Sequence, residues 1–527
     1  MMRILRYLPF LAGALSLLVA LVARIRLLSI PFERDEAIFV QMAKALLRGD
    51  NLYSTAIDNK LPGLYGVYAL FVGLFGDTAT GVHTGVLIWQ ILTWGACFWL
   101  CSRVLDRGPA LLATGIFALY AAAPQVMGFA GHATQLLALP ALLGVGLLLR
   151  NPSSGSGRAG VGSAFRMPYS EFLAGLLFGL AILIKQQAFF YPIAGGLFLL
   201  WQSRQTANWK QGILRVLLFA AGVFLPYIIC YAWYVAQGRL EDFWFWTVEM
   251  PGAMAGDTTS SKSGGLLREF GGKVLQTWGG VWLLALAGAV VAFRKTQAWI
   301  LPVLLLFSLL ATAVSGLFYQ HYFVLALPWA ALCAVLGWQF ISDKIPAGGL
   351  VALLAALLWP LAQNNAYWFS APPRSIIREV YGMNPFVEMQ EVGDALKKRM
   401  RPGDVAVAFG SEPELALYTG SAAPPETWFF YPRLPEGPQQ QRFREGFNKF
   451  YQQKTPRFVV IPSALLSIYM KDKQFESVFQ QLRQNYQAIG VGELYPDKTE
   501  YNWNPGPAPV PKTKDWIIIV ERKAIVQ

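Results

Sequence analysis

Charged side chains are scarce in this chain: Asp, Glu, Lys and Arg make up 14% of its 527 residues, whereas hydrophobic residues make up 55%. The mean hydropathy of +0.40 is too high for a soluble globular protein, so that class is excluded. Cysteine is also rare. The four cysteines all lie in apolar runs, which excludes a disulfide framework outside the membrane: Cys97, Cys101, Cys230 and Cys333.

Recognisable nucleotide-binding motifs are missing as well. The sequence contains neither an Asp-x-Asp pair nor a P-loop. Residues 155–160, GSGRAG, match G-x-G-x-x-G, but they lack the preceding strand and the following helix that a dinucleotide site requires. The net charge of +13 does not indicate nucleic-acid binding, because the basic residues gather in short loops between apolar runs.

Long apolar runs are abundant and predict a polytopic α-helical membrane protein. A helix needs about 20 apolar residues to cross about 30 Å of hydrocarbon. We expect eleven spans, at residues 5–25, 82–102, 109–128, 133–150, 171–185, 187–203, 213–236, 276–294, 298–316, 321–341 and 348–368. The first run has no small-residue cleavage site, so we expect it to be retained. The shorter run from Leu61 to Phe75 is expected to be juxtamembrane or re-entrant.

Loop charge predicts the orientation of the spans. Basic residues precede the first span and recur in the loops on that same side, which places the N-terminus in the cytoplasm. Residues 1–369 then form a membrane domain whose first outer loop is 26–81, and the chain after about 370 lies outside. In residues 370–527, the β-rich runs DVAVAFG, RFVVIP and WIIIVER are separated by amphipathic stretches. This pattern predicts a small α/β domain on the outer face.

The first outer loop carries charges of both signs beside the membrane. From Asp35 to Leu47, apolar residues recur at helical spacing, so we expect a helix on the membrane surface with Asp35 and Glu36 at its N-terminal end. The helix dipole stabilises negative charge there by about 0.3–1 kcal/mol, so capping alone is one explanation of the two acids. Pro62 ends any helix in the following segment, which returns Lys60 to the headgroup level.

A carboxylate and a cation in one outer loop suit attack on a sugar attached to a lipid phosphate. The acceptor hydroxyl requires a general base, while the leaving polyprenyl phosphate is a stable anion that requires charge stabilisation rather than protonation. One carboxylate and one cation therefore suffice, unlike the paired carboxyl groups of a glycoside hydrolase. A lipid-linked donor also agrees with the missing nucleotide motifs.

The segment DEAIFVQMAKALLRGDNLYSTAIDNKLPGLY resembles the first outer loop of the protein mannosyltransferase and lipid A aminoarabinose transferase superfamily, which are family 39-like glycosyltransferases with the GT-C fold. The segments LAGLLFGLAILIKQQAFFYPIAGGL and SGLFYQHYFVLALPWAALCA resemble two further parts of that family. The resemblance covers nearly the whole chain and implies a bacterial member with about 11–13 transmembrane helices. It implies Asp35 as the catalytic base, Glu36 as its neighbour in the motif and Lys60 as the residue that holds the donor phosphate.

Two positions depart from the family pattern. Many relatives have Lys-Pro-Pro where this chain has Lys60, Leu61 and Pro62. Relatives often carry an acid at the outer start of the fourth span, where this chain has Gln135. The need for a divalent metal is therefore left open, and no other cofactor is expected.

Further polar residues are expected near the outer ends of the spans. Lys185 is expected to assist Lys60 on the phosphate, with a snorkelling anchor as the alternative. For His132 a solvated loop histidine is an equal alternative, and for His83 a structural role is favoured. The expected substrate cavity comprises Asp58, Tyr65, His132, Gln135, Gln186, His321 and Tyr322.

The sequence thus predicts a glycosyltransferase of the bacterial inner membrane. It is expected to move one sugar from a polyprenyl-phosphate-linked donor to a hydroxyl of a glycan, lipid or protein on the outer face. Membrane lipids are further partners, and nucleic acid is not. The alternatives are a flippase or transporter of polyprenyl-linked lipids and an envelope assembly protein without catalysis. Chemistry separates them, because a flippase leaves the sugar–phosphate bond intact.

Overall fold

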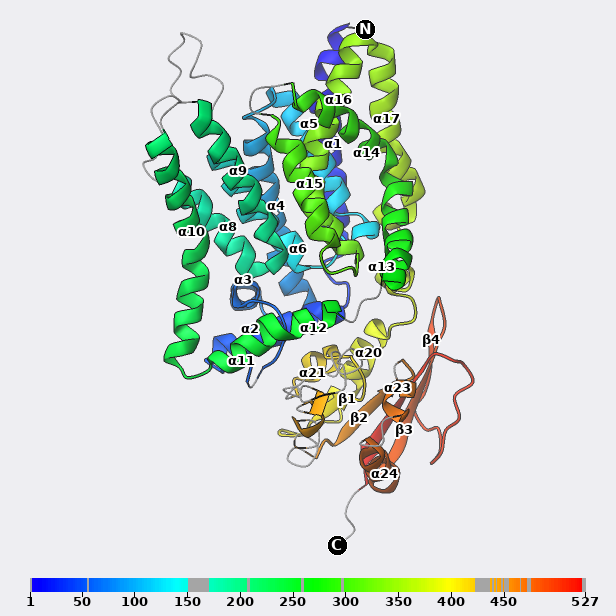
Figure 1. Cartoon of the computed structure of the whole chain (residues 1–527). Helices are drawn as coiled ribbons and strands as arrows, with labels where there is room; N and C mark the ends of the chain where they lie inside the picture. The colour runs from blue at the N-terminus through cyan, green and yellow to red at the C-terminus, as the bar shows by residue number, and fades with distance from the viewer. Residues whose placement is uncertain are drawn as a thin grey trace.

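The computed structural model describes residues 2–523 except for residues 55, 150–169, 206–208, 257–259, 295–297, 422–436, 438–439, 442, 447–448, 450–454, 465 and 472–474. The GSGRAG stretch at 155–160 lies outside the described residues. The described part is mostly helical, with one small sheet near its C-terminal end (Figure 1).

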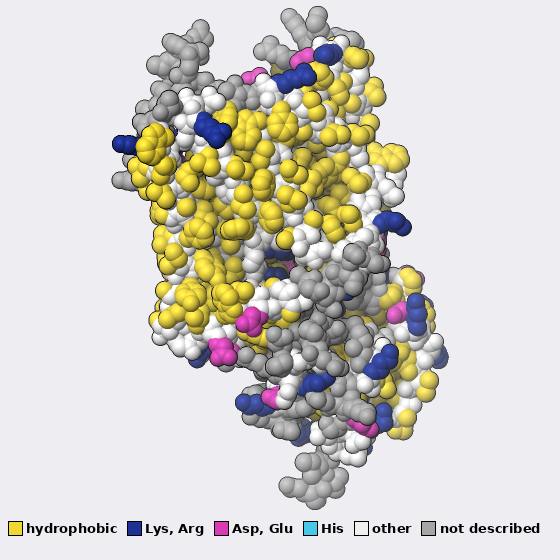
Figure 2. Space-filling model, in the orientation of Figure 1, with side chains coloured by type: hydrophobic (Ala, Val, Ile, Leu, Met, Phe, Trp, Pro, Cys, Tyr) yellow, Lys and Arg dark blue, Asp and Glu magenta, His cyan; other side chains and the backbone are white. Residues whose placement is uncertain are grey.

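Apolar helices form the larger part of the molecule, and hydrophobic side chains cover its surface there (Figure 2). Six helical segments of the described chain are long and apolar enough to cross a membrane. The first of them is Tyr7–Arg26 within α1 (Met2–Arg26), and the others contain α4 (Ala79–Cys101), α10 (Trp209–Ala236), α14 (Gly272–Ala292), α16 (Leu327–Lys344) and α17 (Pro346–Gln363). Shorter helices accompany them: α3 (Pro62–Phe75), α5 (Arg107–Ala121), α6 (Ala133–Leu136), α7 (Ala138–Leu148), α8 (Ser170–Ile184), α9 (Phe190–Gln205) and α15 (Ile300–Ala313). Each predicted span range overlaps a described helix, and the chain is a multi-pass membrane protein.

Small residues let the membrane helices approach one another closely. A Cβ atom on Gly288 of α14 would lie 1.7 Å from the carbonyl oxygen of Cys333 on α16. A Cβ atom on Gly13 of α1 would lie 2.5 Å from the carbonyl oxygen of Leu111 on α5. Such close contacts are the main source of helix association in lipid, where burying an apolar side chain against another helix releases little free energy.

Several short helices lie at the end of the bundle nearest the sheet, and α2 runs across that end (Figure 1). They are α2 (Arg34–Arg48), α11 (Leu240–Trp244), η4 (Phe245–Glu249), α12 (Met250–Gly256), α13 (Ser260–Leu266) and η5 (Leu267–Gly271). The range of α2 matches the predicted surface helix, and its apolar residues Ile38, Phe39 and Met42 are buried. Its polar side contacts the C-terminal part of the chain, because the side-chain amide of Gln41 donates a hydrogen bond to the carbonyl of Pro413, at 2.7 Å.

The C-terminal part builds a five-stranded sheet with the order β1-β2-β5-β3-β4. The strands are β1 (Ala406–Ala408), β2 (Phe458–Pro462), β3 (Tyr486–Leu494), β4 (Thr499–Asn502) and β5 (Trp516–Arg522). β1 pairs with β2 in parallel, and the other pairings are antiparallel. The three β-rich runs of the sequence form β1, β2 and β5. The sequence did not indicate β3 and β4, because β3 contains Gly490 and Gly492 and β4 is the polar segment TEYN.

The helices α18 (Asn365–Phe369), α19 (Pro373–Tyr381) and α20 (Phe386–Lys397) lead from the membrane part to β1. Within the sheet region, α21 (Glu414–Thr419) follows β1, and α23 (Leu466–Lys471) and α24 (Glu476–Asn485) follow β2. The loop before α21 and α21 itself contact α2 and the residues that precede it. The hydroxyl of Tyr418 accepts a hydrogen bond from the Phe32 N–H at 3.0 Å, and a guanidinium nitrogen of Arg34 lies 3.6 Å from Glu412. The C-terminal part therefore holds the start of α2 in place.

Candidate active site

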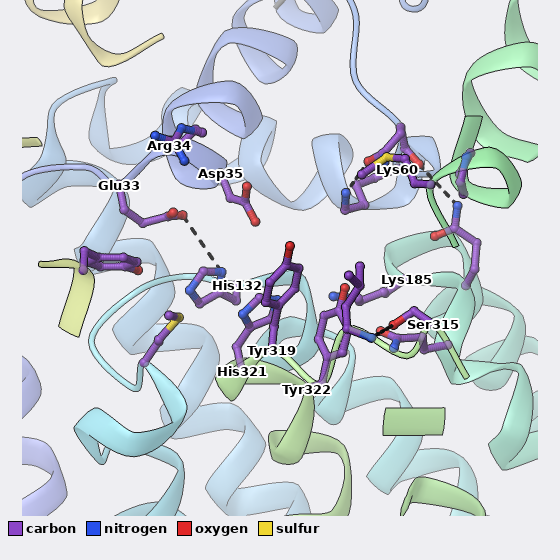
Figure 3. A pocket seen from close by; sticks show the side chains of 18 of the residues that line it. Glu33, Arg34, Asp35, Lys60, His132, Lys185, Ser315, Tyr319, His321 and Tyr322 are labelled. Carbon is purple, nitrogen blue, oxygen red and sulfur yellow. Dashed lines mark hydrogen bonds and ion pairs between the residues drawn. The ribbon is translucent and has the colours of Figure 1, made fainter. Parts of the chain in front are cut away.

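A cavity of about 320 Å³ opens between the start of α2, the ends of several membrane helices and the C-terminal part (Figure 3). Its volume is at the lower end of the range of small-molecule sites. Many of the predicted site residues line it: Asp35, Lys60, His132, Lys185, Gln186, His321 and Tyr322. The remaining predicted residues are not part of its lining: Glu36, Asp58, Tyr65 and Gln135.

Asp35 lies in the first turn of α2, and its carboxylate points into the cavity (Figure 3). The helix is capped by Glu33, whose side-chain oxygen accepts a hydrogen bond from the Glu36 N–H at 2.8 Å. The side-chain cap of α2 is therefore Glu33 and not Asp35. Among the described residues, no side chain forms a hydrogen bond or ion pair with the Asp35 carboxylate, so its oxygens are available to a ligand.

Two lysines line the cavity opposite the start of α2 (Figure 3). Lys60 lies just before α3, and its ammonium group donates a hydrogen bond to the side-chain oxygen of Asn59. Lys185 follows α8 and is buried, with its ammonium nitrogen 4.2 Å from the centre of the Tyr322 ring. In the part of the chain that the structure describes, neither ammonium group pairs with a carboxylate. Two cations held by neutral groups in one cavity suit an anionic ligand.

Two histidines from distant segments stack on each other in the cavity. His132 directly precedes α6, and His321 lies in η6 (Gln320–Ala326). Their ring centroids are 4.1 Å apart, and the ring planes differ by 10°. His132 is only 2% exposed, so it is not a solvated loop residue, and burial lowers the pKa of its imidazole. The Tyr322 ring meets His321 edge-on at 4.7 Å and fixes that side of the stack.

Glu36 joins α2 to the turn that carries His132. Its Oε1 atom accepts a hydrogen bond from the Gly131 N–H at 2.6 Å and lies 3.1 Å from Nε2 of His83. Burial alone would raise the pKa of Glu36, but the attraction of His83 and the bond from Gly131 outweigh it and lower the pKa. The turn is tight, since a Cβ atom on Gly131 would lie 2.6 Å from the Tyr68 hydroxyl. Glu36 and His83 thus have the contacts of positioning residues.

The other predicted residues outside the lining also support the cavity wall. The Tyr65 hydroxyl donates a hydrogen bond to Asp58 at 2.9 Å and accepts one from the Lys60 N–H at 3.1 Å. Burial raises the pKa of Asp58. Gln135 accepts a hydrogen bond from Arg24 at 2.9 Å and donates one to the last carbonyl of α5 at 3.0 Å. Gln135 is therefore placed in a buried link between helices rather than in the cavity.

Gln186 links the loop that carries Asn59 and Lys60 to the short helices at the end of the bundle. Its side-chain nitrogen lies 3.4 Å from the carbonyl oxygens of both Asn59 and Thr247. Met254 of α12 closes the same wall, because the Asn59 amide lies 3.4 Å from its sulfur. The aromatic segment around α11 and η4 therefore contributes to the cavity wall through its contacts with this loop.

The cavity contains further residues that the sequence analysis did not select. Glu33 stands one residue before Arg34 in the run PFERDE, and its Oε1 atom lies 3.9 Å from Nδ1 of His132. Burial, and after it the charge of Asp35, raises the pKa of Glu33. Asn384 and Phe386 come from the C-terminal part. Glu33 could have been selected from the sequence, because it is a third acid close to the Asp35-Glu36 pair. No sequence pattern connects Asn384 or Phe386, about 350 positions further along the chain, to this loop.

The arrangement can accept a proton and bind an anion in one place. Asp35 offers an unpaired carboxylate, and Lys60 and Lys185 offer positive charge across the cavity. Asp35 also stands with His132 and His321 in a group whose potential ligand atoms for a metal ion all lie within 4.8 Å of one another.

No family model and no curated protein matches this sequence. The structure is similar to the archaeal oligosaccharyltransferase AglB from Archaeoglobus fulgidus, solved in complex with an inhibitory peptide and a dolichol-phosphate. The TM-score is 0.57 at 11% sequence identity, over 96% of this chain and 75% of that chain. It is also similar to ArnT from Cupriavidus metallidurans bound to undecaprenyl phosphate, with a TM-score of 0.56 at 14% identity, over 88% of this chain and 94% of that chain. The fold of this chain is the GT-C fold.

Proposed function

We propose that this protein is a membrane glycosyltransferase that moves a sugar from a polyprenyl-phosphate donor to an acceptor hydroxyl on the outer face of the membrane. The observation that carries the proposal is the cavity in which the unpaired carboxylate of Asp35 lies opposite the ammonium groups of Lys60 and Lys185. A binding protein for a lipid phosphate would need the lysines, but it would have no use for an unpaired base facing them.

In the proposed reaction, Asp35 accepts the proton of the acceptor hydroxyl while that oxygen attacks the anomeric carbon of the sugar. The new C–O bond forms on the face opposite the phosphate. The bond between the anomeric carbon and the phosphate oxygen breaks, and its electron pair stays on that oxygen. Lys60 and Lys185 stabilise the resulting polyprenyl phosphate, so no general acid is needed. This displacement inverts the configuration of the anomeric carbon.

The GT-C fold supports a lipid-linked donor for this cavity. One solved structure of similar fold contains dolichol-phosphate, and another contains undecaprenyl phosphate. The apolar helices beside the cavity would hold it next to the membrane, where such a lipid tail can lie. Glu36 then acts as a positioning residue, because it holds the turn of His132 against α2.

The test is a donor-cleavage assay on purified protein in lipid nanodiscs. A panel of polyprenyl-phosphate sugars is supplied together with cell-envelope extract as the source of acceptor, and release of free polyprenyl phosphate is measured. We expect the wild type to cleave one donor and Asp35→Asn to be about 10²- to 10⁴-fold slower, the usual contribution of a general base.

The matched control is Asp77→Asn, which makes the same chemical change at a half-exposed aspartate that pairs with Lys44 and does not line the cavity. It should cleave the donor at the wild-type rate. Wild-type turnover by Asp35→Asn would refute the role of Asp35. Tight binding of a donor that is never cleaved, with extract present, would instead identify a flippase or carrier.

A further inference from the structure

The loop that carries Lys60 contains a residue with an unusual backbone conformation. Tyr53 has a φ of 68°, in the left-handed region that a bulky side chain rarely adopts. Such a conformation is unfavourable and persists only where the surroundings impose it, and residues of this kind are frequent near active sites. The backbone N–H of Tyr53 donates a hydrogen bond to the carbonyl of Ala56 at 2.7 Å, so the chain folds back on itself at this point.

The ring of Tyr53 is fully buried in a cluster of aromatic side chains from three other segments. Its centroid lies 6.3 Å from that of Tyr65 in α3, 5.6 Å from that of Tyr234 in α10 and 5.8 Å from that of Phe243 in α11. The Tyr234 and Phe243 rings stack on each other at 4.5 Å. A phenylalanine would fill this cluster as well as a tyrosine, so packing explains the ring of Tyr53 but not its hydroxyl.

The hydroxyl of Tyr53 binds the backbone of Lys60. It donates a hydrogen bond to the Lys60 carbonyl oxygen at 2.7 Å, although the two residues are 7 positions apart. On the other side, the Tyr65 hydroxyl accepts a hydrogen bond from the Lys60 N–H at 3.1 Å. Two buried tyrosines therefore hold the two polar backbone groups of Lys60 and fix this residue between α3 and the aromatic cluster.

The two lysines of the cavity are thus fixed in different ways (Figure 3). Lys185 directly follows α8, and its backbone N–H continues the hydrogen bonds of that helix, to the Ala181 carbonyl at 3.0 Å. Lys60 lies in a loop, and its ammonium group bonds to the side chain of Asn59 in the same loop. Since a lysine side chain is long and flexible, the place at which its charge meets an anion depends on how well the backbone is fixed.

We propose that Tyr53 is a positioning residue for Lys60: its hydroxyl fixes the carbonyl group of Lys60 and thereby determines where the ammonium group meets the phosphate of the donor. The aromatic cluster holds the hydroxyl in place, and the left-handed backbone of Tyr53 turns it toward Lys60. This role rests on the proposed function, in which Lys60 stabilises the phosphate.

The test is a double-mutant cycle on the full-length protein in lipid nanodiscs, with undecaprenyl phosphate as the probe. Tyr53→Phe removes the hydroxyl and keeps the ring. We expect it to bind undecaprenyl phosphate about 3- to 10-fold more weakly than the wild type, the loss typical of one hydrogen bond. The Lys60→Met background is measured at concentrations at which the phosphate still binds through Lys185. There, Tyr53→Phe should cause no further loss, because the hydroxyl acts through Lys60.

A second measurement reports on Lys60 without any ligand. Lysines are methylated with isotope-labelled formaldehyde, and the NMR signal of Lys60 is identified by its absence in Lys60→Met. Tyr53→Phe should shift this signal, because the lysine backbone is no longer held at its carbonyl. The shift does not require that the protein binds or cleaves a donor.

The matched control is Tyr120→Phe, which removes the hydroxyl of another buried tyrosine. Tyr120 lies in α5 outside the cavity lining, and its hydroxyl accepts a hydrogen bond from Trp282 at 2.8 Å. This variant should keep the wild-type affinity for undecaprenyl phosphate and the wild-type Lys60 signal. Thermal unfolding without ligand shows that both phenylalanine variants are folded.

The role of Tyr53 would be overturned by an unchanged Lys60 signal in Tyr53→Phe, or by an equal loss of binding in the wild-type and Lys60→Met backgrounds. Donor cleavage, measured on the same preparations, separates this result from the proposed function. Coupling between Tyr53 and Lys60 without cleavage of any donor refutes only the function. Cleavage by the wild type without such coupling refutes only the role of Tyr53.

Discussion

Charged residues are arranged differently in the C-terminal part and in the cavity. In the C-terminal part, Oε1 of Glu388 accepts hydrogen bonds from Arg374, at 3.1 Å, and from Arg378. Arg457 similarly pairs with Asp404 and with Glu521 of β5. In the cavity, by contrast, a carboxylate and two lysines face each other without pairing. Among the described residues, Asp35 forms no ion pair with Lys60 or Lys185.

The paired charges of the C-terminal part stabilise the fold, whereas the unpaired charges of the cavity are available to bind a ligand. A buried charge is strongly unfavourable unless it is paired and hydrogen-bonded. The Glu388 cluster meets this condition within the protein. In the cavity, the charges become paired only when an anion binds beside Lys60 and Lys185 and a proton or cation binds to Asp35. The predictions below change one charge at a time in each region.

Among the three changes described next, the largest effect is expected for Lys60→Met. Removal of this cation takes away part of the charge stabilisation of the leaving phosphate, so donor cleavage should fall about 10²- to 10³-fold, as for the loss of one such group elsewhere. Cleavage at saturating donor and donor affinity are both measured. Lys44→Met is the control, because Lys44 pairs with Asp77 and does not line the cavity. A Lys60→Met enzyme with wild-type kinetics would show that this lysine does not face the phosphate.

A smaller effect, on stability rather than on activity, is expected for Glu388→Gln. Glu388 is fully buried, and the neutral side chain would leave Arg378 without its buried counter-charge. We expect a loss of about 2–3 kcal/mol in the unfolding free energy of the C-terminal part. Limited proteolysis or hydrogen exchange of the full chain measures it. Donor cleavage per folded molecule should stay at the wild-type value, and a large loss there would break the distinction between the two regions.

The smallest effect is expected for Glu412→Gln, at the contact between the two regions. Burial raises the pKa of Glu412 to about 7, and the nearby Arg34 only partly offsets this. Because the folded-state pKa lies above the unfolded value of about 4.3, stability is highest at low pH and falls as the pH rises from about 4 through 7. Glu412→Gln should remove this component, so that Tm falls by a few degrees less between pH 5 and pH 8. An unchanged pH dependence would contradict the assignment.

Much of the fold and part of the site could be predicted from the sequence. Apolar runs of sufficient length indicated the membrane helices, and helical spacing after Asp35 indicated α2, because both signals are local. The Asp-Glu pair and Lys60 stood out because charge is rare beside a membrane. Gln135 was expected in the cavity only from its position in the family pattern, and its side chain instead binds Arg24.

The remainder depends on long-range packing. Nothing near His132 in the sequence indicates that it stacks on His321, since the contact needs α6 and η6 to meet. The contribution of Asn384 to the cavity likewise depends on how the C-terminal part packs against α2. β4 was missed for a different reason, because a polar edge strand has neither the apolar run nor the alternation that marks a buried strand.

The most direct test of the account is to measure donor binding and donor cleavage on the same preparations of wild type, Asp35→Asn and Lys60→Met. If Asp35 is the base and Lys60 binds the phosphate, Asp35→Asn binds the polyprenyl-phosphate sugar about as tightly as wild type but releases polyprenyl phosphate about 10²- to 10⁴-fold more slowly. Lys60→Met loses binding and cleavage together. If instead Asp35→Asn cleaves the donor as fast as wild type, or if Lys60→Met binds and cleaves it normally, the carboxylate and the lysine are not the reacting pair of a glycosyltransferase.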